Sequence, residues 1–440
     1  MSVSTRLRGR TVRHAGRVVA LTALIVGALA ACGPSHPLSI FTRYTDLNRD
    51  IGGLFRILMV LGFAVFVFVE GLLIWAIVRY RRRGALDQMP EHVHGNTTLE
   101  IIWTAIPALI LVVIAVPTVR TIFKTQAKAP RGALEVEVIG HQWWWEFRYP
   151  EYGIVTANEL YLPLGRTVNF ALKTQDVIHS FWIPQLAGKR DLISNHTNYI
   201  WFTPDSVSEN AWVGHCVEYC GASHANMRFR AFTVSPQDFQ SWVTHQQSVA
   251  ANPLVPTAPP PGAAPALPPG APATAATTPA TTPATVPAAA QPTVTLAGFT
   301  GYPRDRLPKH AVPATPVPTD IPWPTNIQGD ATRGGRFFAT GIGGCIGCHA
   351  VKGVPTAVGV IGPNLSHFGS RTTLAAGYYP NDARHLALWI KNARRMKPGI
   401  IMPTLGKGQM DPQTKQAVSM SLGLDDQQIA DMVAYLLSLK

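Results

Sequence analysis

The chain has 440 residues, which is long for one hydrophobic core, so we expect two or three domains. Hydrophobic residues make up 47% of the chain and charged residues only 14%, a balance typical of a protein that is part membrane-bound and part soluble. The net charge of +13 includes arginine clusters at residues 6–17 and 79–83, neither of which lies on an RNA- or DNA-binding motif. We therefore interpret the charge as a targeting and membrane-topology signal and expect no nucleic-acid partner.

Residues 1–31 have the pattern of an export signal. A basic region is followed by an apolar stretch from Val18 to Ala31, which has the length of a signal-peptide core and is short for a membrane span. The stretch ends in Leu29-Ala30-Ala31-Cys32, which resembles the cleavage motif of bacterial lipoproteins. That resemblance implies that Cys32 is lipidated and becomes the first residue of the mature chain. The alternative is an ordinary signal peptide followed by an unmodified cysteine.

Residues 32–125 are expected to form a transmembrane hairpin. The apolar segments 54–78 and 99–119 each approach the roughly 20 residues that cross a bilayer as a helix. Basic residues follow both segments, so the positive-inside rule gives no clear orientation. If Cys32 is processed on the outer face, two spans return the chain to that same face. We therefore expect a multi-pass protein of the bacterial plasma (inner) membrane, with the rest of the chain on the periplasmic side.

Residues 131–248 change to short runs in which apolar and polar side chains alternate, as in a half-buried strand. The run 134–138 alternates in this way, and further β-type runs follow at 167–172, 199–202 and 228–234, separated by Pro, Gly and Asn turns. The pattern predicts an all-β sandwich or barrel of roughly 100 residues.

Residues 249–322 are mostly Pro, Ala and Thr, with almost no large apolar side chain to bury, so they are expected to form an exposed linker. Residues 323–440 return to helical periodicity, with expected helices at 383–396 and 425–439, and predict a small all-α domain. Residues 131–248 carry 8 basic and 11 acidic residues, whereas residues 321–440 carry 12 basic and 6 acidic ones. Opposite net charges favour the encounter of the two domains.

Residues with metal-binding side chains are clustered between positions 216 and 227. Cys216, Cys220, His224 and Met227 can present two thiolates, an imidazole and a thioether from one turn, and His179 offers a second imidazole. Soft sulfur ligands suit copper, and two thiolates can bridge two copper ions. The alternatives are a disulfide, common between cysteines of exported proteins, and the site of a copper-delivery protein. A disulfide, however, needs neither the histidine nor the methionine.

From about residue 40 to 245 the chain resembles subunit II of cytochrome c oxidase, which carries a dinuclear copper centre (CuA) in a cupredoxin-like sandwich. The resemblance rests on the string from Cys216 to Met227 and on residues 176–180 (DVIHS), 140–145 (GHQWWW) and 100–104 (EIIWT). It implies that Cys216 and Cys220 bridge the metals and that His179 and His224 are the terminal ligands.

The same resemblance implies roles for four more residues. Met227 and the main-chain carbonyl of Glu218 would be the axial copper ligands. The Glu218 side chain would hold magnesium at the contact with subunit I. Trp143 would lie where electrons enter the copper centre, and Glu100 would lie near the mouth of a proton path.

Cys345-Ile346-Gly347-Cys348-His349 is the attachment signature of c-type haem, in which two thioether bonds fix the porphyrin and the histidine supplies one axial ligand. With residues 362–365 (GPNL), it makes residues 325–440 similar to a class I cytochrome c. That resemblance implies Met402, within Ile401-Met402-Pro403, as the second axial ligand. Met396 and Met410 are the alternatives.

Together, the two resemblances describe subunit II fused to cytochrome c, as in bacterial caa-type oxidases. They imply the electron-accepting subunit of cytochrome-c oxidase, which passes electrons from its own haem c through CuA to subunit I. Oxygen reduction and proton pumping would occur in subunit I, because this chain has no multi-span core rich in histidine. The implied partners are subunits I and III, and the implied donor is an external cytochrome c or a quinol:cytochrome c reductase. The alternatives are an electron-transfer subunit of another respiratory reductase and a copper-delivery or assembly protein.

Overall fold

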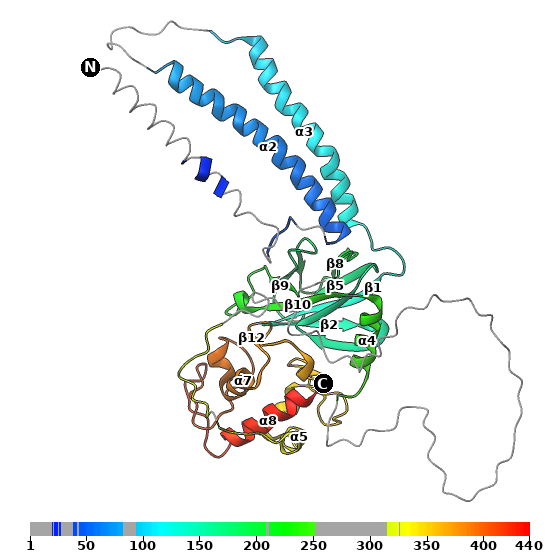
Figure 1. Ribbon diagram of the computed structural model, residues 1–440, viewed down its shortest axis with the longest axis vertical. Helices are drawn as coiled ribbons and strands as arrows, with labels where there is room; N and C mark the ends of the chain where they lie inside the picture. Colours follow the sequence, from blue (N-terminus) through cyan, green and yellow to red (C-terminus); the bar gives the residue numbers. More distant parts are fainter. Residues whose placement is uncertain are drawn as a thin grey trace, which may run out of the picture.

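The computed structural model describes residues 20, 22–24, 26–27, 38–41, 44–81, 94–207, 211–250, 315–324 and 326–440. Three parts follow one another in space: a helical hairpin, a β-sandwich and a helical domain that lies against the sandwich at the end away from the hairpin (Figure 1). Cys32, most of the expected signal peptide and residues 251–314 of the expected linker lie outside the described residues. The predicted fold class is confirmed.

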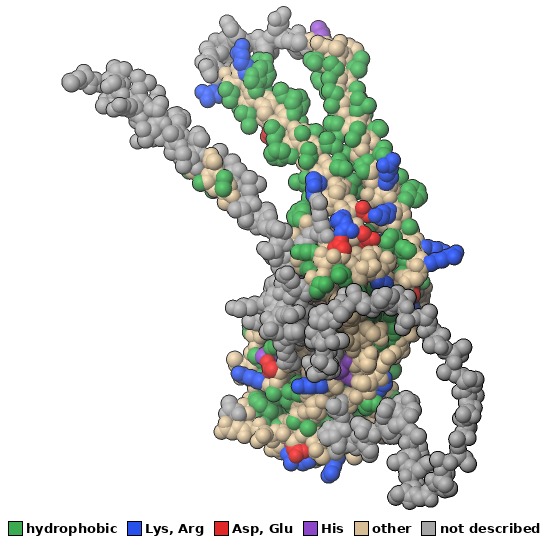
Figure 2. Space-filling model, turned by 45° about the vertical axis from the view of Figure 1, so that its right-hand side comes forward, with side chains coloured by type: hydrophobic (Ala, Val, Ile, Leu, Met, Phe, Trp, Pro, Cys, Tyr) green, Lys and Arg blue, Asp and Glu red, His purple; other side chains and the backbone are tan. Residues whose placement is uncertain are grey.

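The hairpin consists of α2 (Asp46–Arg79) and α3 (Thr97–Gln126), both long and apolar enough to cross a membrane. Each begins at a polar cap, because the Thr45 hydroxyl accepts from the Asn48 amide and the Asn96 side chain accepts from the amides of Thr98 and Leu99. Figure 2 shows hydrophobic side chains along the outside of the hairpin. An apolar exterior of this length is what a bilayer or a membrane partner covers.

The hairpin is attached to the sandwich at the start of α2 and the end of α3. The Asn48 side chain donates to the Gln185 carbonyl at 2.9 Å, and the Thr203 amide donates to the Asp46 carboxylate at 2.8 Å. After α3, the Ala127 carbonyl accepts a hydrogen bond from the Trp201 indole at 2.8 Å. Both helices therefore have their sandwich-side ends in one place, as expected when two spans return a chain to the same face (Figure 1).

The sandwich is built from two five-stranded sheets, with strand orders β3-β2-β1-β5-β8 and β4-β10-β9-β6-β7. The predicted strands at 134–138, 167–172, 199–202 and 228–234 correspond to β1, β5, β8 and β10. The strands are β1 (Leu134–His141), β2 (Trp144–Tyr149), β3 (Ile154–Ala157), β4 (Glu159–Pro163), β5 (Val168–Thr174), β6 (His179–Trp182), β7 (Arg190–Leu192), β8 (Asn198–Phe202), β9 (Trp212–Cys216) and β10 (Arg228–Val234). The helix α4 (Pro236–Gln247) follows β10 and packs on β3 and β4.

Aromatic side chains fill the space between the two sheets. Phe229 of β10 is fully buried, and its ring centroid lies 5.3 Å from that of Trp145, 5.4 Å from that of Phe147 and 5.1 Å from that of Phe181. These contacts join strands of both sheets around one centre. Burial of such large rings supplies much of the hydrophobic stabilisation of a domain of this size.

The C-terminal domain is helical, with α7 and α8 where the sequence predicted helices at 383–396 and 425–439. The structure adds one feature to the expected all-α domain, a short antiparallel ladder of β11 (Thr373–Leu374) and β12 (Tyr379–Pro380). The helices are α5 (Ala331–Ala339), α6 (Cys345–Cys348), α7 (Ala383–Met396) and α8 (Asp426–Ser438), with short 3-10 turns at Ile342–Gly344 and Phe368–Ser370.

The helices α5 and α8 pack against each other closely enough to require glycine. A Cβ atom placed on Gly334 would lie 2.0 Å from the main-chain oxygen of Asp431. The Asp431 carboxylate is itself buried. It accepts a hydrogen bond from the Arg333 guanidinium at 2.6 Å and another from the Asp330 amide at 2.8 Å. The contact therefore holds α8 on α5 through both shape and charge.

We expect Gly334→Ala to destabilise the C-terminal domain by about 1–3 kcal/mol, because the obstructing atom is backbone and cannot rotate away. The measurement is the denaturant midpoint of the haem absorption of the full chain. Gln416→Ala is the control, since that side chain is exposed on the same domain. Equal midpoints for the two variants would contradict the close contact.

Candidate metal centre and adjoining haem pocket

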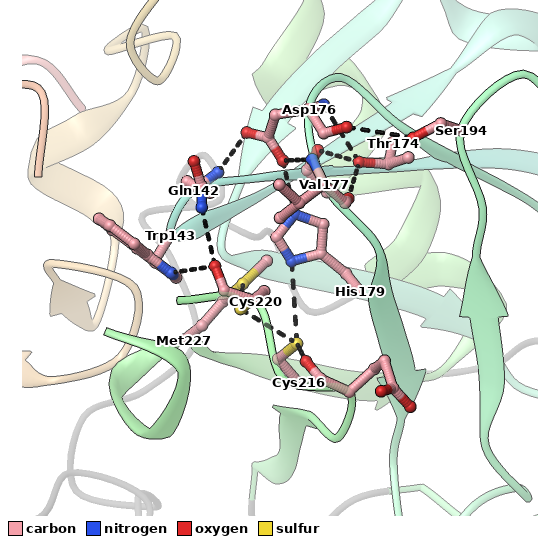
Figure 3. A network of polar contacts seen from close by, with 12 residues as sticks. Gln142, Trp143, Thr174, Asp176, Val177, His179, Ser194, Cys216, Cys220 and Met227 are labelled. Carbon is pink, nitrogen blue, oxygen red and sulfur yellow. Dashed lines mark hydrogen bonds and ion pairs between the residues drawn. The ribbon is translucent and has the colours of Figure 1, made fainter. Parts of the chain in front are cut away.

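The expected copper ligands lie at one edge of the sandwich. His179 opens β6 and Cys216 closes β9, and these strands pair so that Phe181 is opposite Cys216. After Cys216, a loop containing the 3-10 turn His224–Asn226 returns the chain to β10. The cross-strand pairing thus brings together ligands that are 37 residues apart in sequence (Figure 3).

The side chains converge on the two cysteine sulfurs. The Sγ atoms of Cys216 and Cys220 are 3.7 Å apart. His179 Nδ1 lies 3.8 Å from Cys216 Sγ, and His224 Nδ1 lies 3.6 Å from Cys220 Sγ. Met227 Sδ is 3.9 Å from Cys220 Sγ, and the Glu218 carbonyl oxygen is 3.3 Å from Cys216 Sγ. Each of the other four atoms that the resemblance implies as ligands therefore lies within 4 Å of one of the two sulfurs.

This donor set fits two copper ions. The sulfur separation exceeds the roughly 2.05 Å of a disulfide bond, and both cysteines are free thiols. Ligand atoms of His179, Cys216 and Cys220 all lie within 4.8 Å of one another, and all three residues are buried. Each sulfur has its own imidazole and its own weak ligand, which is the symmetry that a thiolate-bridged pair of metals requires.

The two thiols differ in acidity. A hydrogen bond with Cys220 and a further one with His179 lower the pKa of Cys216 to about 3, against the effect of burial. The same sulfur contact, together with burial, raises the pKa of Cys220. Within the pair, Cys216 is therefore the more acidic thiol and Cys220 the less acidic one.

Asp176 orients His179, a role that the sequence alone did not assign. The Asp176 carboxylate lies 2.7 Å from His179 Nε2, so the opposite ring nitrogen points to the cysteines (Figure 3). The carboxylate is held in turn by the main-chain amides of Gln142 at 2.6 Å and Val177 at 2.7 Å. Although burial lowers the pKa of His179, its hydrogen bonds to Asp176 and Cys216 raise it overall. A carboxylate three residues before a ligand histidine is the signal that could have identified Asp176.

A large, mostly apolar cavity in the C-terminal domain contains the expected haem-attachment residues. Cys345, Cys348, His349 and Met402 all line it. His349 Nδ1 lies 2.8 Å from the Pro363 carbonyl, which leaves the other ring nitrogen free to bind iron. A Cβ atom on Gly362 would lie 2.5 Å from this ring, so the glycine allows the chain to pass over it. The residues present fit a covalently attached haem.

The three candidate methionines occupy different environments. Met402 lines the cavity and also packs against the core of the sandwich. Met396 is buried in the core of the helical domain, whereas 57% of Met410 is exposed to solvent.

Trp143 belongs to both sites. It occupies the turn between β1 and β2, and its indole Nε1 donates to the Cys220 carbonyl at 3.0 Å (Figure 3). The same side chain lines the haem cavity, although it comes from the other domain. Only 8% of Trp143 is exposed. Glu100, by contrast, lies in the first turn of α3, at the far end of the hairpin from the copper ligands (Figure 1).

Three family models match the chain. The transmembrane domain of cytochrome c oxidase subunit II matches residues 44–121, and the periplasmic domain of that subunit matches residues 154–234. The cytochrome c model matches residues 331–440.

Curated proteins similar to this chain include two that span most of its length. The cytochrome c oxidase subunit 2 of Alkalihalophilus pseudofirmus is 31% identical over 346 residues, which cover 78% of this chain and 75% of the relative. The subunit 2 of Bacillus sp. strain PS3 is 30% identical over 359 residues, 78% of this chain and 80% of the relative. Among solved structures, the periplasmic domain of subunit II of cytochrome oxidase from Bradyrhizobium japonicum matches 27% of this chain and 96% of its own, with 27% identity and a TM-score of 0.26.

We expect Asp176→Asn to weaken copper binding about 10- to 100-fold, because His179 loses the group that sets its orientation. Competition with a chelator of known affinity measures the change. Glu135→Gln is a matched control, since this carboxylate bonds the Asn169 side chain on the exposed side of the same domain. Equal copper affinities for the two variants would show that Asp176 does not orient His179 for metal binding.

We also expect copper binding to strengthen as the pH rises. Because contact with Cys216 and burial raise the pKa of Cys220, this thiol has to lose a proton when copper binds, so affinity is expected to increase up to about tenfold per pH unit. Chelator competition between about pH 6 and 8, with proton release followed by an indicator dye, measures this linkage. A pH-independent affinity would mean that both thiols are already ionised before copper binds.

Proposed function

Because this chain belongs to the cytochrome c oxidase subunit II family and also contains a cytochrome c domain, we propose that it accepts electrons at its own haem and delivers them to a dinuclear copper centre that serves subunit I. Subunit I of a haem-copper oxidase would then reduce oxygen to water, coupled to proton pumping. The two metal groups supply reversible one-electron oxidation and reduction when bound. The chain supplies their ligands, their separation and the path between them.

The observation that carries this proposal is the position of Trp143. Its side chain forms part of the haem-cavity wall and donates a hydrogen bond to the Cys220 carbonyl. A single residue thus connects the two sites through an aromatic ring and one hydrogen bond. With a haem bound in the cavity, Trp143 would connect it to the main chain of a copper ligand.

The copper-binding residues would hold the metals with little rearrangement. Cys216 and Cys220 would bridge the ions, His179 and His224 would each bind one ion, and Met227 and the Glu218 carbonyl would be the weak ligands. All six positions lie on β6, on β9 or in the loop between β9 and β10, and Cys216, Cys220 and Met227 are buried in the sandwich core. A copper-delivery protein has to release its metal, which six surrounding ligands would hinder. The ligand set therefore favours a copper centre that stays in the protein.

Further roles follow from the family and from the arrangement of the parts. The Glu218 side chain is proposed to bind magnesium where subunit I docks, and Glu100 to lie near a proton path at the other membrane face. Both soluble domains would be periplasmic, with the hairpin packed against subunits I and III in the bacterial inner membrane. Cys32 is proposed as the lipidated start of the mature chain. The donor is proposed to be an external cytochrome c or a quinol:cytochrome c reductase.

The test of the relay is Trp143→Phe in the full chain. Loss of the indole hydrogen bond to Cys220 should slow electron transfer from haem to copper at least about tenfold, as measured after rapid photoreduction of the haem. Trp201→Phe is the control, because that indole bonds Ala127 beside the hairpin.

The same samples should contain two coppers per haem and show one unpaired electron delocalised over both in paramagnetic resonance. A single localised copper would instead indicate a delivery protein.

Met402→Ala should abolish the low-spin Met/His spectrum of the haem and lower its reduction potential, because a strong axial ligand is removed. Met410→Ala is the matched control, since that side chain is largely exposed. Optical spectra and redox titration of the full chain provide the measurement. If the Met402→Ala variant kept its low-spin spectrum, Met402 would not be the axial ligand, and Met396 would be the next candidate.

A further inference from the structure

Charged side chains are buried where the sandwich meets the haem domain. Lys397 of the haem domain is 2% exposed, and Glu159 and Arg230 of the sandwich are 3% and 0% exposed. Charged groups are rarely buried at protein contacts unless each has partners, because removing them from water is costly. Each of these three has a partner on the opposite domain.

Lys397 follows the end of α7 and reaches across the contact. Its Nζ donates to the Trp143 carbonyl at 2.8 Å and to the Ala375 carbonyl of its own domain at 2.9 Å. Burial lowers the pKa of Lys397 to about 7, which reflects how costly the charge is at this place. Lys397 makes both hydrogen bonds only when the haem domain is oriented so that the Trp143 carbonyl lies beside its Nζ. Lys397 thus hydrogen-bonds Trp143, the residue that contacts both the haem cavity and the copper ligands.

Glu159 and Arg230 contact one haem-domain segment, residues 372–377. The Glu159 carboxylate accepts from the Thr372 amide at 2.6 Å and from the Thr372 hydroxyl at 2.5 Å. Arg230 donates to the Gly377 carbonyl at 3.0 Å. A Cβ atom on Gly377 would lie 2.9 Å from this guanidinium, so the close contact favours glycine. The φ of +72° at this residue favours glycine for a second, independent reason.

Apolar packing continues across the same contact. Ile400 and Ala393 of the haem domain belong to the hydrophobic core of the sandwich. A Cβ atom on Gly399, whose φ is +83°, would lie 2.8 Å from the Trp143 ring. The two domains therefore share a close-packed surface around Trp143.

We propose that Lys397, Glu159 and Arg230 form an orientation lock that holds the haem domain permanently over Trp143. The lock rests on the proposed relay function and adds that the haem domain does not swing. Buried charges of this kind add little affinity, but any other docked orientation would bury them without partners and is heavily penalised. Affinity comes from the apolar contact and from the covalent connection between the domains, which keeps their effective concentration high.

The lock has a consequence for the external donor. Trp143 is covered, so a soluble electron carrier cannot reach it and has to deliver electrons to the attached haem. The donor is therefore expected to approach the haem domain rather than the copper domain.

The experiment compares the full-length holoprotein with Lys397→Met and with a matched control, Lys391→Met. Lys391 is also buried and belongs to α7, but its Nζ donates to Asp426 of the same domain and to the carbonyl of Pro322 just before that domain, not to the sandwich. The measured quantity is hydrogen exchange at two amides that donate across the contact, Arg228 to the Ala376 carbonyl and Thr372 to Glu159. We expect protection in the native chain and in Lys391→Met, and exchange at least about tenfold faster in Lys397→Met.

Glu159→Gln, which keeps the shape and removes the charge, covers the case in which Lys397→Met fails to fold, and it should loosen the same amides. Two results would overturn the lock: unprotected amides in the native chain, or unchanged protection in both lock variants. Haem-to-copper electron transfer, measured in parallel at several viscosities, separates the lock from the relay. Protected amides without any transfer would reject the relay but keep the lock, whereas viscosity-dependent transfer with unprotected amides would keep the relay and reject the lock.

Discussion

The hydrogen bond from the Trp143 indole to the Cys220 carbonyl is the contact on which the rest of the molecule depends. Electron transfer between two centres requires that they be close and that the connecting atoms hold still. Trp143 meets both conditions because it sits in the tight connection between β1 and β2, which are paired up to His141 and Trp144. The strands fix the residue, and the residue fixes the distance between the copper ligands and the haem cavity.

The copper-binding loop is prepared for metal by its scaffold. The pairing of β6 with β9 sets the separation of His179 and Cys216, and the main-chain amides of Gln142 and Val177 fix the carboxylate that orients the histidine. The scaffold therefore holds the ligand atoms close to one another. A site held in this way changes little between oxidation states, which suits electron transfer more than it suits exchange of the metal.

The contact between the domains differs in kind from the attraction expected from their net charges. Long-range attraction between a basic and an acidic domain accelerates encounter but specifies no orientation. The structure instead has single buried charges that end on main-chain groups of the other domain, such as Lys397 on the Trp143 carbonyl and Arg230 on the Gly377 carbonyl. Such groups have fixed positions and directions, so they specify one orientation.

The sequence by itself determined the chemistry of this protein, because the ligands of each centre lie mostly within one short segment. Cys216, Cys220, His224 and Met227 fall within twelve residues, and Cys345, Cys348 and His349 within five, so their spacing along the chain already carries the geometry. Strands β1, β5, β8 and β10 and helices α7 and α8 were likewise predictable from the periodicity of their apolar residues, because that periodicity marks the buried face of each element. The tertiary structure decided what has no local signature: that the Asp176 carboxylate orients His179, and that Lys397 donates to the Trp143 carbonyl, 254 residues away in the sequence. These contacts depend on how two finished surfaces fit together, and no periodicity along the chain records that fit.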